Sequence, residues 1–303
     1  MTRRIRAAPV CALLFLACSA PQADAPAAAP ANQELPLIHL PEPSPVEEKV
    51  QRGLLDADPE AFQLIDDSPR LSLHKPMSIL PVTWSEDYHG RRTEMLFQLS
   101  LKYRLLHRWP VYFGYTQKSF FDIYDSSESK PFRESDYNPE LFYRYIHVGA
   151  DGERKLGADA GIEHESNGKG LPDSRSWNRL YLAPFYAEGT RLVYWKLWWR
   201  IPEDKSLPRD DPNRDDNPDI GSYYGYSELH YEQRLFGKQM AHLMARWNPS
   251  TGHAAASLQY SIPSSSADPD FFWYFYLWQG YGESLIDYKR SITRVGVGVA
   301  LAR

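Results

Sequence analysis

The fold is decided by MLFQLSLKYRLL, residues 95–106, in which apolar and polar side chains alternate. Consecutive side chains of a β-strand point to opposite faces of a sheet, so this period of two predicts a strand with one apolar and one polar face. The apolar face carries Phe97, Leu99, Leu101, Tyr103 and Leu105, and the polar face carries Gln98, Ser100, Lys102 and Arg104. Because sheets in water also alternate, this strand alone does not distinguish a soluble sandwich from a barrel in lipid.

Aromatic residues separate these two alternatives. The alternation continues in HAAASLQYSI (253–262) and TRVGVGVALAR (293–303), while RLVYWKLWWR (191–200) and FFWYFYLWQGYGE (271–283) are far richer in aromatics than an ordinary solvated sheet. Such density is typical of the aromatic girdles of a transmembrane barrel. The length of residues 93–303, divided by the roughly 9–11 residues of a spanning strand and its turn, gives about a dozen strands. We therefore predict an all-β fold, a 12-stranded antiparallel transmembrane β-barrel, closed because open sheet edges are not tolerated in lipid.

Composition and the N-terminus indicate an exported protein that would cross a membrane only with strands. The net charge of −5 is spread without a basic stripe, which argues against a nucleic-acid partner. After the N-terminus, no apolar run approaches the roughly 18 residues of a membrane helix. MTRRIRAAPVCALLFLACSA predicts a signal peptide over residues 1–19, in which Cys18 resembles a lipoprotein cleavage cysteine. Residues 20–48 are predicted to form a Pro/Ala-rich flexible segment, and residues 49–92 a periplasmic lead-in.

One segment, GADAGIEHESNGKGLPDSRSWNRLYL (157–182), carries candidate chemistry. His164 and Ser166 continue the apolar face of the strand before them, and Asn178 shares its face with Leu180 on the returning strand. All three polar side chains are therefore predicted to point outward, toward lipid. Polar groups there are costly unless they are used.

Ser, His and Asn are residue types that can form a nucleophilic triad. A serine needs a base to take its proton, and that base needs a third group to fix its tautomer. His164 and Ser166 lie two apart on one face, and Asn178 would reach His164 across the hairpin. Glu163 and Glu165 have the opposite parity, which excludes them as the third group. H-x-S is a common tripeptide and SNGKG is typical of a turn, so spacing alone does not establish catalysis.

HESNGKGLPDSRSWNR (164–179) closely resembles the active-site signature of outer-membrane phospholipase A. Other segments similar to that family stand in the family's order, namely FQLSLKYRLL, GYTQKSFFDIYDSSESKPFRESDYNPELF, DDNPDI, GYGESLIDY and TRVGVGV. The resemblance covers roughly residues 75–303. It implies a 12-stranded antiparallel barrel, in agreement with the strand number expected from length.

The resemblance also implies an activity. It indicates a hydrolase of membrane phospholipids and lysophospholipids, with phospholipase A1, phospholipase A2 and lysophospholipase activity. By this resemblance Ser166 attacks the acyl ester carbonyl, His164 accepts and returns the proton, and Asn178 holds His164. Gly168 gives its backbone N–H to the oxyanion.

Calcium and a homodimer are further implications of the resemblance. The ion is expected on the Ser174 hydroxyl and the main-chain carbonyl of Lys169, together with the carbonyl at Ser129 of the partner subunit. The family's second calcium site uses an aspartate at the position of Leu171, together with the position of Asp216. Because leucine has no oxygen ligand, this second site is doubtful here.

Two questions stay open at the level of sequence. Gln117 matches a glutamine that the family buries at its dimer interface, but a lumen-facing glutamine in a hydrogen-bond network is the alternative. A non-catalytic barrel, either a porin or a structural anchor, would explain every strand, although it would not explain three outward polar residues. A soluble lipase usually carries a G-x-S-x-G elbow, and this sequence has none.

Overall fold

The computed structural model describes residues 62–65, 70–88, 91–106, 108–124, 132–150, 152–208, 211, 214–265 and 271–302. The chain divides into two compact units, residues 1–42 and 43–303, and every described residue belongs to the second. The predicted signal peptide (1–19) and Pro/Ala-rich segment (20–48) therefore lie outside the described residues. Among the described residues, no helix is long and apolar enough to cross a membrane.

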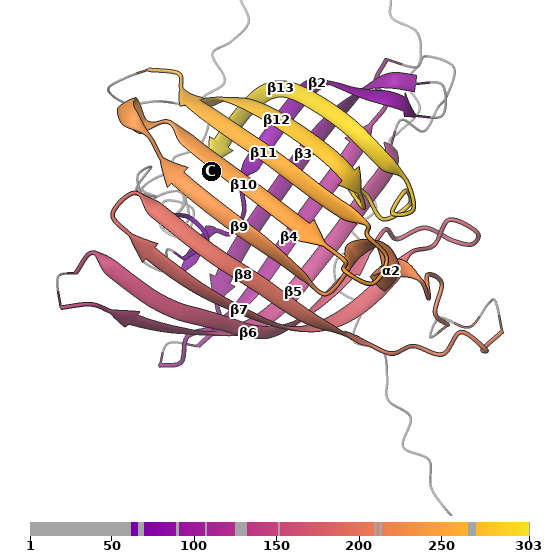
Figure 1. Ribbon diagram of the computed structural model, residues 1–303, viewed down its shortest axis with the longest axis horizontal. Coiled ribbons are helices and arrows are strands. Elements are labelled where there is room, and N and C mark those ends of the chain that lie inside the picture. The colour runs from indigo at the N-terminus through magenta and orange to yellow at the C-terminus, as the bar shows by residue number, and fades with distance from the viewer. Residues whose placement is uncertain are drawn as a thin grey trace, which may run out of the picture. The chain divides into compact units, whose positions relative to one another are not determined.

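Twelve long strands make up most of the described chain (Figure 1). They are β2 (Met77–Tyr88), β3 (Arg91–Arg104), β4 (Val111–Phe121), β5 (Phe132–Val148), β6 (Arg154–Ser166), β7 (Ser176–Glu188), β8 (Arg191–Ile201), β9 (Ser227–Arg234), β10 (Met240–Trp247), β11 (Ala254–Pro263), β12 (Phe272–Tyr281) and β13 (Ser291–Ala302). The short elements are β1 (Leu71–Leu73), the helix α2 (Ile220–Tyr224) and the 3-10 turn η1 (Phe236–Lys238).

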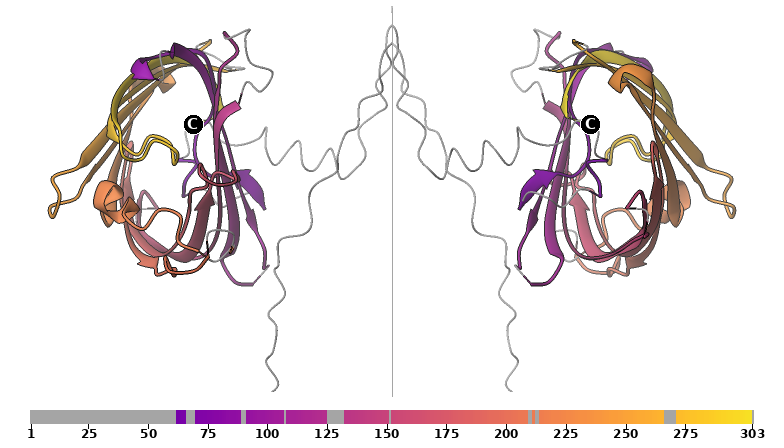
Figure 2. Two further views of the ribbon diagram at one scale, coloured as in Figure 1. Left: turned by 90° about the vertical axis from the view of Figure 1, so that its right-hand side faces the viewer. Right: turned by 90° about the vertical axis from the view of Figure 1, so that its left-hand side faces the viewer.

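The sheet closes on itself. Neighbouring strands are antiparallel from β2 to β13, and β13 pairs back with β2, which gives the closed section visible in Figure 2. β1 pairs with β3 at Leu73↔Leu101, beyond the Ser78↔Gln98 pair of β2 and β3, so β1 extends the row of β2 instead of adding a strand to the ring. The predicted 12-stranded antiparallel barrel is confirmed. Its first strand starts at Met77, inside the residues 49–92 that we expected to precede the barrel.

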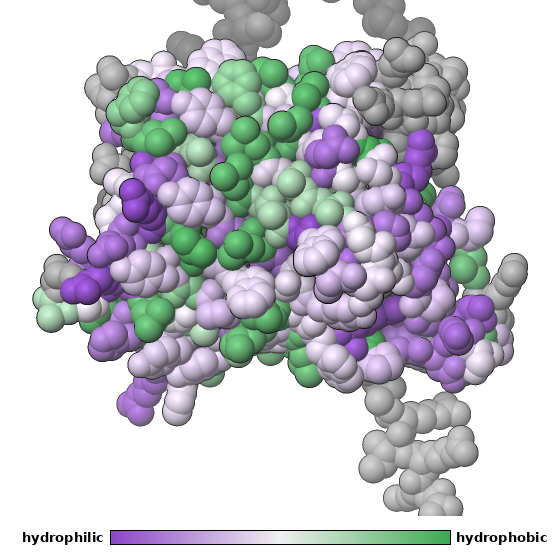
Figure 3. All heavy atoms as spheres, viewed as in Figure 1, coloured by the Kyte–Doolittle hydropathy of each residue, from purple (hydrophilic) through white to green (hydrophobic). Residues whose placement is uncertain are grey.

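Exposure alternates along the strands as the sequence pattern predicts. In β13, Val295 and Val297 are exposed, whereas Arg294 and Ala300 are fully buried. Figure 3 shows apolar side chains gathered across the face that β9 to β12 present, with hydrophilic side chains gathered toward the left and lower right of the view. An apolar outside and a charged inside reverse the pattern of a soluble protein and suit a barrel surrounded by lipid.

Paired side chains neutralise the charged interior. Arg144 makes two hydrogen bonds to Asp159, of 2.7 and 2.6 Å. Arg294 lies between Glu283, at 2.8 Å, and Glu94, at 3.0 Å. Buried charges are tolerated when each has an opposite charge and its hydrogen bonds, and leaving one of them without its partner is strongly unfavourable.

The seam between β13 and β2 requires a glycine. A Cβ atom added at Gly298 would lie 2.1 Å from the carbonyl oxygen of Ile79 in β2, well inside van der Waals contact. A residue with a side chain at this position would push the two strands apart. The GVGV pattern of the last strand therefore serves barrel closure.

Arg294→Ala should destabilise the barrel by about 3–5 kcal/mol, because the buried Glu283 carboxylate loses its ion pair, whereas Glu94 keeps Arg133. The free energy of unfolding can be measured in guanidinium by tryptophan fluorescence of protein refolded in micelles. The matched control is Arg191→Ala at an exposed strand end, which should change stability by less than about 0.5 kcal/mol. Equal stabilities of the two variants would contradict this role for Arg294.

Candidate active site

The candidate residues are positioned by the β6–β7 hairpin. The two strands pair with His164 opposite Asn178 and Ser166 opposite Ser176. Directly opposite residues of an antiparallel pair project from the same face, so their side chains can meet. Ile162 and Leu180, the next residues on this face, are exposed. The outward orientation predicted from parity is confirmed.

A hydrogen bond joins two of the three residues. His164 Nδ1 lies 2.9 Å from Asn178 Oδ1. An amide oxygen only accepts, so Nδ1 is the donor and Nε2 keeps its lone pair. Ser166 lies on the same face two residues further, but in the described part of the chain no hydrogen bond joins its Oγ to His164. Catalytic hydrogen bonds often form only when substrate is bound.

The loop that follows Ser166 adopts a special backbone conformation at Gly168. Its φ of 64° lies in the left-handed region, and an added Cβ would lie 3.3 Å from the ring of Tyr137. Glycine adopts this conformation without steric cost. The turn fixes the direction of the backbone N–H of Gly168, which is the group expected to face the oxyanion.

The loop is braced by Asn167, a residue that sequence reasoning missed. Its buried side chain accepts hydrogen bonds from the backbone N–H groups of Lys169 (3.3 Å) and Arg175 (3.0 Å), and donates to the carbonyl oxygen of Asp173 (2.8 Å). It also donates to Glu134 in β5 at 3.0 Å. The SNG signal correctly indicated a turn, but the sequence gave no sign of this long-range partner.

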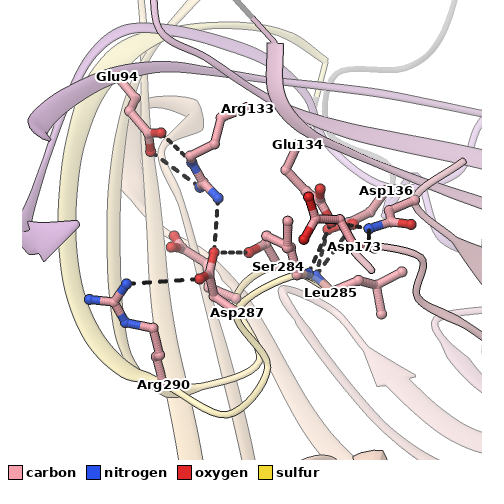
Figure 4. Close-up of polar contacts among 12 residues, drawn as sticks. Glu94, Arg133, Glu134, Asp136, Asp173, Ser284, Leu285, Asp287 and Arg290 are labelled. Atoms are coloured by element: carbon pink, nitrogen blue, oxygen red, sulfur yellow. Dashed lines mark hydrogen bonds and ion pairs between the residues drawn. The ribbon is translucent and has the colours of Figure 1, made fainter. Parts of the chain in front are cut away.

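Glu134 links the Asn167 loop to a second segment, the loop after β12 (Figure 4). Its carboxylate also accepts the backbone N–H of Ile286 at 2.9 Å, and the neighbouring Asp136 accepts that of Leu285 at 3.3 Å. Arg133 bridges Glu94 and Asp287 beside them. The GESLID motif therefore folds against Glu134, which also holds the loop after Ser166, and against the neighbouring Asp136.

Ser174, an expected calcium ligand, lies beside Asp216, a residue expected only at the doubtful second site. Ser174 Oγ donates a hydrogen bond of 2.5 Å to Asp216, which reaches it from the loop between β8 and β9. A hydroxyl and a carboxylate are oxygen donors of the kind that calcium prefers. The Lys169 ammonium group lies 3.3 Å from Glu134, and Leu171 is exposed and offers no oxygen in its side chain.

The remaining expected ligand, Ser129 of the partner subunit, lies outside the described residues of this chain. Within the residues that the structure describes, no group of three or more His, Cys, Asp or Glu side chains could hold a metal. Calcium can also be held by hydroxyl and main-chain oxygens and by water, because its coordination is flexible.

Gln117 lies on the outer surface of the barrel. The residues on either side of it in β4 face inward: Thr116 is buried, and Lys118 donates to Tyr276 inside. Gln117 pairs with Tyr137 in β5, which pairs with Ser166 in β6. The lumen-facing alternative is therefore wrong, and Gln117 lies two strands from Ser166 on the same face.

Sequence reasoning also missed Glu203. The Asn178 amide donates a hydrogen bond of 2.8 Å to the Glu203 carboxylate, just after β8. The β7–β8 register pairs Asn178 with Ile201, which brings the following residues close to it. This register is not readable from the sequence alone.

These observations define a class, a transmembrane barrel that carries residue types of a serine hydrolase on its lipid-facing surface. The family model for phospholipase A1 matches residues 66–301. Phospholipase A1 of Escherichia coli K12 is 37% identical over 238 residues, 74% of each chain, and the putative phospholipase A1 of Neisseria meningitidis serogroup B is 35% identical over 218 residues, 69% of this chain and 54% of that one.

Two solved structures resemble the barrel. Outer membrane phospholipase A of E. coli superposes with a TM-score of 0.65 at 34% identity, over 75% of this chain and 96% of that one. The Salmonella typhi outer membrane phospholipase, a dimer with bound calcium, gives 0.67 at 33% identity, over 82% and 98%. The chain belongs to the phospholipase A1 family. It is a hydrolase of the bacterial outer membrane, which it crosses with its strands.

Asn167→Ala should lower turnover of a phospholipid ester about 100-fold, because loosening the loop would displace the backbone N–H of Gly168 that is expected to face the oxyanion. Turnover of refolded protein in mixed micelles checks this. The control is Gln259→Ala, which removes another amide bonded inside the barrel, to Tyr274 at 2.5 Å. If both variants lose activity equally, the effect comes from general destabilisation and the proposed bracing is wrong.

Proposed function

We propose that this protein hydrolyses acyl esters of membrane glycerophospholipids and lysophospholipids, with phospholipase A1 and A2 activity, by a Ser166–His164–Asn178 triad. The observation that carries the proposal is the hydrogen bond between His164 and Asn178 on the outward face of the barrel. This face lies where the acyl chains of membrane lipids are. An active-site mutant of the E. coli protein changes an asparagine to alanine, which supports a catalytic asparagine in the family.

In the proposed mechanism, His164 Nε2 takes the proton of Ser166 as Oγ attacks the ester carbonyl. The tetrahedral oxyanion receives the backbone N–H of Gly168. When the intermediate collapses, His164 gives the proton to the leaving alcohol oxygen and the acyl group stays on Ser166. Water, deprotonated by His164, then releases the fatty acid. Asn178 keeps Nδ1 protonated throughout, although as a neutral group it adds no charge to stabilise the imidazolium.

Calcium is proposed as the cofactor. Ser174 and the main-chain carbonyl of Lys169 would hold it, with the carbonyl at Ser129 of the partner subunit, and the proximity of Ser174 and Asp216 supports an oxygen-rich site. When bound, calcium supplies positive charge near the oxyanion. Because Leu171 offers no side-chain ligand, we propose a single calcium site for each active site and not a second one at Leu171 and Asp216.

The proposed active form is a homodimer that meets through the face containing Gln117. On that face the amide accepts from Tyr115 and donates to Ser119, both at 3.1 Å. An outward amide of this kind can pair with a second protein surface more favourably than with lipid. Since Gln117 and Ser166 share a row across β4 to β6, a partner docked there would border the catalytic residues.

Ser166→Ala should abolish release of fatty acid, and His164→Ala should reduce it by about 10²–10⁴-fold. Asn178→Ala should be milder, because a neutral orienter contributes alignment without charge. The rates are measured with phospholipid in mixed micelles and calcium, after heat-modifiable gel mobility confirms folding. Near-native turnover of Ser166→Ala would disprove the nucleophile, and equal losses in His164→Ala and Asn178→Ala would disprove the ranking.

Ser174→Ala should raise the calcium concentration needed for half-maximal activity, because it removes a ligand, and excess calcium should partly restore turnover. Calcium should promote dimerisation and dimerisation should tighten calcium binding by the same factor. Sedimentation and calorimetry across a calcium series measure both effects. Ser250→Ala, at an exposed turn, is the control. Two ions per subunit in the unmodified protein, or full activity in chelator, would contradict the single-site proposal.

A further inference from the structure

A fourth side chain continues the line of hydrogen bonds behind His164. Asn178 Oδ1 lies 2.9 Å from His164 Nδ1, and Asn178 Nδ2 donates to Glu203 Oε1 at 2.8 Å. The three residues come from three separate segments, namely β6, β7 and the loop after β8. Both ends of the Asn178 amide are therefore occupied.

The chemistry of a carboxylate fixes the orientation of that amide. An ionised carboxylate only accepts hydrogen bonds, whereas an amide has a donor end and an acceptor end. With Glu203 on one side, the NH₂ group of Asn178 must face Glu203, and its oxygen must face His164. The ring then has to donate through Nδ1, which leaves Nε2 free to accept the serine proton.

The reversed amide would produce the wrong histidine. If the NH₂ group faced the ring, Nδ1 would accept and the proton would sit on Nε2, so that Nε2 could not act as a base toward Ser166. Asn178 by itself does not choose between these two arrangements, since its two ends are similar in size and shape. The hydrogen bond to Glu203 favours the arrangement in which the Asn178 oxygen faces His164.

The neighbouring Arg200 competes little with Asn178 for the Glu203 carboxylate. Its second oxygen, Oε2, is buried and makes no hydrogen bond within the described residues, and Arg200 Nη2 lies 3.7 Å from it. Arg200 is held more closely by Asp215, at 2.7 Å. Burial raises the pKa of the Glu203 carboxyl, while the hydrogen bond from Asn178 opposes that rise.

We propose that Glu203 is a positioning residue of the catalytic site, which orients the Asn178 amide and thereby sets the tautomer of His164. The proposal rests on the proposed function of Ser166, His164 and Asn178. The third group of the triad, the neutral Asn178 amide, is then held in place by the negatively charged Glu203 carboxylate. It also gives a catalytic purpose to the loop after β8.

The first test separates binding from turnover. Glu203→Ala should lower kcat by about 10–100-fold, the value of a hydrogen bond to a charged group, with KM nearly unchanged because the proposed action of Glu203 runs through Asn178 and not through the substrate. Glu203→Gln should lose less, since its amide oxygen can still accept. The control is Asp204→Asn, which alters the adjacent exposed acid and should leave kcat unchanged. A fall in kcat of equal size for Asp204→Asn would overturn the assignment.

The second test is a double substitution. Activity should recover in it if Glu203 acts through Asn178, and should not recover if Glu203 has a merely structural role. Asn178→Asp should be severely impaired, because it places two carboxylates face to face. Adding Glu203→Gln should raise kcat at least about 10-fold above that single variant, because glutamine can donate to the new carboxylate, which then accepts from His164 Nδ1. A double variant no more active than Asn178→Asp would overturn the proposal. This comparison still decides if Glu203→Ala fails to fold.

The nitrogen chemical shifts of labelled His164 in micelles give an independent readout. The protein should show the Nδ1–H tautomer, and Glu203→Ala should show a mixture, whereas an unchanged tautomer would overturn the role of Glu203. Failure of the proposed triad and failure of the proposed role of Glu203 give different results. Activity that survives Ser166→Ala removes the proposed triad itself, while loss in Ser166→Ala with wild-type kcat in both Glu203 variants removes only Glu203.

Discussion

In a bilayer no water is available to pair an exposed backbone N–H or C=O, and the rest of this structure depends on that constraint. Pairing β13 with β2 removes the last two strand edges, and the close approach at Gly298 makes that pairing possible. Closure then reverses the usual distribution of side chains, with apolar residues outward and paired charges inward. A polar side chain left on the outside needs its own partner, and His164 and Asn178 provide this for each other.

Much of the barrel could be predicted from sequence because its strands are one-sided. The alternation in β3, β11 and β13 gave the inward and outward residues, and length gave the strand number. The sequence pattern instead assigns the residues of β2 to the periplasmic lead-in before the barrel. Its pairing with β3 shifts register between Leu80 and Thr83, around Pro81, which has no N–H to donate, so its period is interrupted. A strand with such a break is recognised from its pairing with the neighbouring strands β3 and β13.

The residues of the candidate site were likewise predictable only in part. Parity placed His164, Ser166 and Asn178 on one face because they lie within regular strands, and the family resemblance supplied the expected roles of Gly168 and Ser174. Neither strand parity nor the family resemblance indicated Asn167 or Glu203. Their partners lie in distant segments, at Glu134 and at Asn178, and are set by strand register and loop path. The polar residues that hold a site in place are therefore less predictable than those that perform its chemistry.

The central claim is that a serine on the lipid-facing surface is activated by the histidine beside it. Peptide mapping by mass spectrometry, after reaction of the refolded protein with a serine-directed sulfonyl fluoride in calcium, tests this most directly. The account predicts a single label on Ser166, lost when His164 is replaced by alanine. A label on another residue, or continued hydrolysis by fully labelled protein, would contradict it.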